Sequence, residues 1–311
     1  MSKLNLQTGN HDVTLDPSFY AQHGTRFHNQ HLEDPQKCIE VLRESPDPSI
    51  VYLCHEPAVI RLTRPEGPNT VFKVFGSPYS PSSSSGSSSK WAFGYETTGD
   101  DDAAVLWDQI PLDTDLVVSH TPPHSHCDRR MTGGPVGCQR LRQVLHRVRP
   151  KLAVCGHVHE SRGYERVRWS SSSSSASGET ETEGQVIIEE ERERGVLPHP
   201  GSKKQSLVDL TGKTTRRLDN AWSSSDRDWT MGVSSCTNST ITRTGNPQMT
   251  TTGQEGHDNG GHAIRARRRE ETCIINAAVM ATSWPHRGGK RFNTPIVVDL
   301  ECPVWNNYRR K

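Results

Sequence analysis

Residues 115–169 constrain the fold of this chain more than any other stretch. They contain two short apolar runs, 116–118 and Leu152–Cys155, and each run ends in a loop that carries histidine. Between the runs, residues 136–148 repeat apolar side chains at helical spacing, with arginines on the opposite side. The pattern predicts a strand–helix–strand unit. Parallel strands joined by such a crossover end at the same edge of a sheet, where open α/β sheets bind their ligands.

Three histidines follow these two predicted strands. His120 lies in the sequence Ser-His-Thr-Pro-Pro after the first strand, and His157 and His159 lie in Gly-His-Val-His after the second. Neutral imidazoles are the commonest side-chain ligands for borderline divalent metals, so their convergence predicts a metal site. The alternative is that each is a surface-loop residue in a chain with fifteen histidines. For a single histidine the alternative is favoured, and for the combined pattern the metal site is favoured.

A further motif, Gly9-Asn10-His11-Asp12, lies near the amino terminus. Taken alone it is an ordinary turn, because Gly, Asn and Asp are turn formers. Together with the two histidine loops, it resembles the last three motifs of the calcineurin-like metallophosphoesterases. The stretches GSPYSP at 76–81, WAFGY at 91–95 and LWDQIPLDTD at 106–115 resemble the branch that includes the mammalian metallophosphoesterase-domain proteins and their fungal homologues.

The resemblance implies a role for each motif residue. In the family site two divalent ions, for which Mn²⁺, Fe and Zn²⁺ are all compatible, hold a hydroxide that attacks phosphorus. His159 resembles a ligand of the first metal, and His11 resembles the histidine that stabilises or protonates the leaving group. Asp12 would orient His11 through a carboxylate–imidazole hydrogen bond. The ligands of the second metal are implied to be Asn10, His120 and His157.

Two motifs of the family pattern, Asp-x-His and Gly-Asp, do not precede Gly9, where the sequence has eight residues. These motifs would supply the carboxylate ligands, and the motifs that remain supply none. Neutral ligands do little to offset the repulsion between two close dications, so we expect at most one weakly held ion and impaired hydrolysis. We also expect a sheet with an unprotected edge. The sequence is therefore read as an amino-terminally truncated form of the enzyme.

The expected fold class is α/β: a calcineurin-like β-sandwich flanked by helices, incomplete at its amino terminus and interrupted by a long insertion. Residues 1–169 would form the metallophosphoesterase domain and 271–305 its closing strands, followed by a tail at 306–311. Between them, 170–270 changes to serine runs, Glu/Thr repeats and the charged run EEERER, which predicts a low-complexity, mostly disordered insertion.

Periodicity also places the remaining elements. Helical spacing predicts helices over 34–44 and 103–107, and the serine-rich stretch 81–89 predicts a flexible loop. His124 and His126 resemble extra candidate ligands, but their place in the loop after His120 favours exposure, with substrate contact as the alternative. The predicted strands are 50–54, 58–62, 71–75, 272–279 and 295–300, with a poor strand at 3–8 and some strand character at 206–213.

Composition limits the partners and the compartment. The 37 basic and 36 acidic residues give a net charge of +1, which provides no global attraction for nucleic acid. The basic cluster RARRR at 265–269 is a nuclear-import or phosphate-binding patch or, preferably, a solvated charge run. No apolar run approaches the roughly 18 residues of a membrane span. Eight cysteines without a Cys-x-x-Cys pair suit reduced thiols, so we expect a cytoplasmic protein, with the nucleus as the alternative.

The sequence therefore predicts a metal-dependent phosphoesterase that hydrolyses small phosphate esters, with phosphodiesters preferred, by means of a metal-bound hydroxide. The alternative is a catalytically inactive scaffold or binding module that retains a partial metal site. Nucleic-acid binding through the basic cluster is a third and weaker hypothesis, and no membrane partner is expected. The sequence identifies no protein partner for the insertion.

Overall fold

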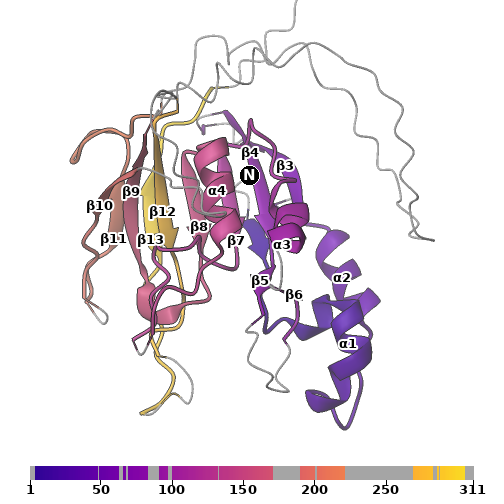
Figure 1. Ribbon diagram of the computed structural model, residues 1–311. Helices are drawn as coiled ribbons and strands as arrows, with labels where there is room; N and C mark the ends of the chain where they lie inside the picture. The colour runs from indigo at the N-terminus through magenta and orange to yellow at the C-terminus, as the bar shows by residue number, and fades with distance from the viewer. Residues whose placement is uncertain are drawn as a thin grey trace, which may run out of the picture.

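The computed structural model describes residues 4–47, 49–62, 66–67, 69–82, 91–96, 100–131, 133–170, 190–199, 202–220, 269–282, 286 and 288–304. Within these ranges the chain forms a mixed α/β structure with helices packed against a central sheet (Figure 1). None of the helices in this described part is long and apolar enough to cross a membrane.

The central sheet has seven strands in the order β10-β9-β12-β8-β7-β4-β3. Its four inner neighbours β12, β8, β7 and β4 run parallel to one another, whereas β10–β9, β9–β12 and β4–β3 pair antiparallel. The bounds are β3 Glu56–Leu62, β4 Thr70–Ser77, β7 Leu116–Ser119, β8 Leu152–Cys155, β9 Gly163–Trp169, β10 Glu190–Arg194 and β12 Glu271–Asn276.

The predicted strand–helix–strand unit is confirmed. Helix α4 (Gln139–Val148) joins β7 to β8, which pair in parallel with Val117 opposite Ala153. Its apolar side packs on one face of the sheet, in a buried cluster that also contains Trp107 and Trp169. The helix begins three residues later than its periodicity predicts, because Cys138 is its N-cap and accepts a hydrogen bond from the Leu141 amide. The buried residues that α4 contributes are Leu141, Val144, Leu145 and Val148.

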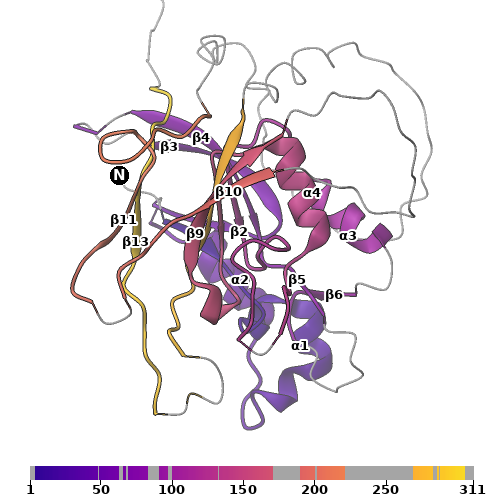
Figure 2. The same cartoon turned by 60° about the vertical axis from the view of Figure 1, so that its left-hand side comes forward.

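A separate pair of strands covers the opposite face of the sheet. Strands β11 (Ser206–Asp209) and β13 (Ile296–Asp299) pair in parallel, beside β9 and β12 in both views (Figure 2). Val208 packs with Leu152, Cys273 and Ile275 of the sheet in a second buried cluster. Because side chains alternate along a strand, their neighbours Ala153 and Ile274 lie in the cluster on the α4 side instead.

The amino-terminal part of the chain forms a smaller layer beside β3 and β4. Strands β1 (Leu4–Gln7) and β2 (Ile50–Leu53) make a two-stranded parallel sheet. Helices α1 (Pro17–His23) and α2 (Pro35–Arg43) each begin at a proline after an aspartate N-cap, as expected for helix starts. The other short elements are α3 (Asp100–Trp107), β5 (Ser80–Pro81), β6 (Gly94–Tyr95), η1 (Val13–Leu15), η2 (Gly24–Arg26) and η3 (His159–Ser161).

The structure confirms every helix and strand that the sequence predicts, with ends shifted by a few residues. Within 170–270 it confirms the strand character expected at 206–213 as β11, and it adds the strand β10, which the sequence does not predict. Residues 171–189, 200–201 and 221–268 of that segment, like most of the predicted serine loop at 81–89, lie outside the described residues. The α/β class is therefore confirmed, whereas the β-sandwich stays a prediction.

Candidate metal centre

Three side chains from three separate loops meet beyond the carboxyl ends of β7 and β8. Nε2 of His120 lies 2.7 Å from Oδ1 of Asn10 and 3.1 Å from Nδ1 of His157. The two imidazole rings are 4.7 Å apart between centroids, and their planes are inclined by 65°. A backbone hydrogen bond from the Gly156 amide to the His120 carbonyl joins the two histidine loops. Two imidazole nitrogens and one amide oxygen, each of a kind that can bind a metal ion, thus lie close together.

The spacing of these atoms fits a single divalent ion. Two ligands bound to one ion at about 2.1 Å, with angles between 90° and tetrahedral, lie about 3.0 to 3.4 Å apart. The 3.1 Å separation between His120 and His157 lies in that range, and the 2.7 Å separation between His120 and Asn10 needs to lengthen by about 0.3 Å to reach it. Asn10 is 8% exposed, so its amide is preorganised rather than free to rotate in solvent. The donor set is one amide oxygen and two imidazole nitrogens, all neutral.

Burial keeps both imidazoles uncharged at neutral pH. Desolvation, together with the smaller effects of His157, His11 and His159, lowers the pKa of His120 to about 3. Desolvation likewise lowers the pKa of His157 to about 4, with the positive charge of Arg130 as the next cause. Because metal ligation uses the neutral form of the ring, neither histidine would have to lose a proton to bind an ion at pH 7.

Gly9 is required for the close approach of the Asn10 turn to His120. A Cβ atom at this position would lie 2.4 Å from Cε1 and 2.5 Å from Nδ1 of His120, well inside van der Waals contact. The turn is closed by a hydrogen bond from the Asp12 amide to the Gly9 carbonyl. A residue with no side chain therefore brings the amide of Asn10 against the imidazole.

His11 and Asp12 lie beside this cluster. The His11 ring packs against Trp91, with centroids 4.3 Å apart, and desolvation lowers its pKa while the charge of Asp12 opposes that shift. Oδ2 of Asp12 accepts a hydrogen bond of 2.7 Å from the Gly9 amide. The contact observed for Asp12 therefore holds the turn closed, and the hydrogen bond to His11 that the resemblance implies stays a prediction.

His159 is near the cluster but does not share its hydrogen bonds. Its Nδ1 lies 3.3 Å from the carbonyl oxygen of Thr282, so Nδ1 carries the proton and Nε2 is left with the lone pair. A positive charge on His159 would repel a second charge nearby, and this effect lowers the pKa of His11, His120 and His157. The carbonyl of Thr282 is a contact that sequence reasoning missed, because it follows β12, more than a hundred residues away.

The loop after His120 differs from the exposed loop that the sequence predicts. His126 is fully buried, and its ring lies between the carboxylates of Glu165, at 3.1 Å, and Glu190, at 3.3 Å. His124 is half-buried and contacts the hydroxyl of Ser125. No local pattern could have revealed the burial of His126, because the two glutamates belong to β9 and β10. It is a structural ion-pair residue rather than a ligand.

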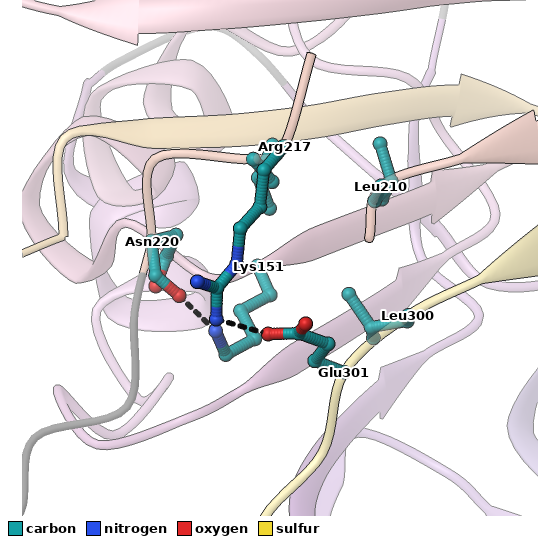
Figure 3. Close-up of a pocket in the computed structure, with 7 residues that line it drawn as sticks. Lys151, Leu210, Arg217, Asn220, Leu300 and Glu301 are labelled. Carbon is teal, nitrogen blue, oxygen red and sulfur yellow. Dashed lines mark hydrogen bonds and ion pairs between the residues drawn. The ribbon is translucent and has the colours of Figure 1, made fainter. Parts of the chain in front are cut away.

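Within the described ranges, no three His, Cys, Asp or Glu side chains gather closely enough to hold a metal ion. The candidate centre therefore depends on the amide of Asn10 together with two histidines. A pocket elsewhere lies at the other end of β8, because Lys151 precedes that strand and His157 follows it (Figure 3). There Lys151 donates to the Asn220 carbonyl, and a nearby ion pair joins two further lining residues, Arg217 and Glu301.

No family model matches the chain. Among curated proteins it is 36% identical over 163 residues to the probable rhamnogalacturonate lyase C of Emericella nidulans, covering 52% of this chain and 13% of that protein. It is 35% identical over 91 residues to a UPF0046 protein of Caenorhabditis elegans, covering 29% of this chain and 21% of that protein. It is 29% identical over 165 residues to metallophosphoesterase domain-containing protein 1 of Homo sapiens, covering 50% of this chain and 44% of that protein.

The chain thus spans less than half the length of each of these relatives. The chain is also similar to the mouse protein of the same name. The matches to the human, mouse and UPF0046 proteins indicate the same relationship as the motifs at the candidate centre. The chain is therefore related to the metallophosphoesterase-domain proteins.

Proposed function

We propose that this chain is part of a metal-dependent phosphoesterase that hydrolyses phosphate esters, with phosphodiesters as the preferred class. The observation that carries the proposal is the convergence of Asn10, His120 and His157 within hydrogen-bonding distance. The packing of β11 and β13 on the face of the sheet opposite α4 supports the calcineurin-like sandwich as the fold.

The residues divide into a metal cradle and a proton donor. A divalent ion held by Asn10, His120 and His157 would supply Lewis acidity toward a phosphoryl oxygen and activate a water molecule. His11, the next residue after Asn10, would protonate the leaving oxygen. Asp12 fixes the turn that positions both, through its hydrogen bond to the Gly9 amide. Mixed nitrogen and oxygen ligation accepts Mn²⁺, Fe or Zn²⁺.

The charge of the donor set supports one ion at this cradle rather than two. Two dications about 4 Å apart repel strongly, and neutral ligands offset little of that repulsion. His159 would take part in holding a second ion only together with carboxylate ligands. Within the described ranges, no three His, Cys, Asp or Glu side chains gather there to hold such an ion. The two-ion form of the reaction therefore requires ligands beyond the described residues.

Hydrolysis of bis(4-nitrophenyl) phosphate in the presence of Mn²⁺ tests the proposal. It is measured for the 311-residue chain and for the longest reading frame that contains it. We expect Mn²⁺-dependent hydrolysis in at least the longer form, and its loss in His157→Ala. The matched control is His199→Ala, which changes an exposed histidine in the loop after β10 and should leave the rate unaltered.

Two results would contradict the proposal. Hydrolysis that persists in His157→Ala at the parent rate would show that the cluster is not the catalytic centre. Absence of hydrolysis in both chain lengths, with the cluster still able to bind Co²⁺, would favour the inactive scaffold or binding module that retains a partial site.

A further inference from the structure

A short loop beside the candidate centre presents an aromatic ring to solvent. Residues 91–96 contain Trp91, Ala92 and Phe93 in succession. Ala92 and Phe93 are buried, whereas Trp91 is 38% exposed. Trp91 thus keeps part of its indole open to solvent, where a bound ring could stack on it.

The loop is hydrogen-bonded to the start of α1, a few residues after the turn that carries Asn10 and His11. Oδ2 of Asp16, the N-cap of α1, accepts a 2.8 Å hydrogen bond from the Phe93 amide. The Phe93 carbonyl accepts one of 3.0 Å from the Ser80 amide. Phe93 has a φ of +56°, a conformation that costs energy for a bulky residue and reverses the chain there. Trp91 is thus held in one position rather than hanging free.

Trp91 lies directly against the proposed proton donor. Its ring centroid is 4.3 Å from that of His11, with the planes tilted by 58°. On another side Phe27 approaches it at 5.5 Å. Phe27 packs against the buried cluster formed by α1 and the loop, so it provides a second fixed contact for the indole. Trp91 and Phe27 together form an aromatic shelf whose outer surface is Trp91.

We infer that Trp91 is a stacking subsite for a planar aromatic ring on the leaving-group side of the phosphate ester. The inference rests on the proposed function, because His11 marks where the leaving oxygen would lie. A group attached to that oxygen must extend past His11, and Trp91 is the exposed surface in contact with His11. An aryl group gains stacking there, whereas a methyl group covers little of the indole. The preferred substrates are therefore aryl esters rather than short alkyl esters.

Calorimetric binding of phenyl phosphate and methyl phosphate tests this, using the full chain with Mn²⁺. The two ligands share the same charged head group and differ only in the ring. The parent should bind phenyl phosphate more tightly than methyl phosphate. Trp91→Ala should weaken phenyl phosphate binding by about 5- to 100-fold, the range expected when a stacking partner is removed, and leave methyl phosphate unchanged. Trp91→Phe should retain most of the preference.

The outcomes separate the two proposals. Equal binding of the two phosphates by the parent, or equal weakening of both in Trp91→Ala with an unchanged circular dichroism spectrum, would overturn the stacking subsite alone. Failure of the parent to bind either phosphate, in the presence or absence of Mn²⁺, would overturn the proposed function and the subsite with it.

Discussion

The contact between Gly9 and His120 makes the candidate centre sensitive to a single methyl group. In Gly9→Ala the new Cβ would lie 2.4 Å from Cε1 of His120, against 3.4 Å or more for an ordinary contact. The ring or the turn must therefore shift by about 1 Å, a displacement large enough to misalign a site. A shift of the His120 ring also moves its Nε2 atom, which contacts Asn10 and His157.

Loss of this alignment should weaken metal binding rather than unfold the protein. Residues that orient ligands without touching the ion change metal affinity by about 10- to 100-fold when altered. We expect a loss of that size for Co²⁺ in Gly9→Ala, measured by isothermal calorimetry and by the visible absorbance of bound Co²⁺. A thermal denaturation of each variant shows whether the fold is retained.

Gly156→Ala is the matched control for Gly9→Ala. Gly156 directly precedes His157, but a Cβ atom there meets no atom within 4 Å. It should bind Co²⁺ like the parent. The reasoning is refuted if Gly9→Ala retains parental affinity, if the two alanine variants weaken binding equally, or if the parent shows no Co²⁺ binding at all.

Two predictions concern the buried charges that hold β9, β10 and β12. Glu271→Gln should lower the free energy of unfolding by about 3–5 kcal/mol, because it leaves the buried guanidinium of Arg166 without its carboxylate. Glu193→Gln alters an exposed ion pair with Arg216 and should change the free energy of unfolding by less than about 0.5 kcal/mol. Equal losses of stability for the two variants in urea denaturation would contradict the argument. For His126, burial favours the neutral ring, but hydrogen bonds to two glutamates raise its pKa overall, so its stabilisation is complete below about pH 6.5 and is lost as the pH rises through the raised value. Glu190, whose pKa is lowered to about 2, stabilises the fold above about pH 4.5 and loses that effect as the pH falls. Thermal midpoints should therefore fall from pH 6.5 toward pH 9 more steeply in the parent than in His126→Phe, and parallel profiles would count against the pair.

The elements around the histidine loops could be predicted because their signals are local. The periodicity of 136–148 and the apolar runs on either side determine α4, β7 and β8, and the crossover rule then brings His120 and His157 to one edge. Asn10 joins them by a contact across 110 residues of sequence. The resemblance grouped it with the histidines, but no periodicity could.

Strand order could not be predicted from the same signals. β12 lies between β9 and β8, although more than a hundred residues separate β12 from either in the sequence. β10 was missed because the run EEERER has a low propensity for strands. It forms a strand nonetheless, since pairing with β9 and the ion pairs of Glu190 with Arg142 and His126 outweigh local preference.

The charge of β10 has a consequence for how molecules of this protein meet one another. β10 is the last strand at one edge of the central sheet, and four of its five residues are exposed. A row of charged side chains on an edge strand discourages a neighbouring molecule from adding its own strand there. A shortened protein that removes 170–195 as a linker would uncover β9 instead. We expect such a variant to self-associate more readily than the parent, so the segment that looks dispensable by composition protects this edge of the sheet.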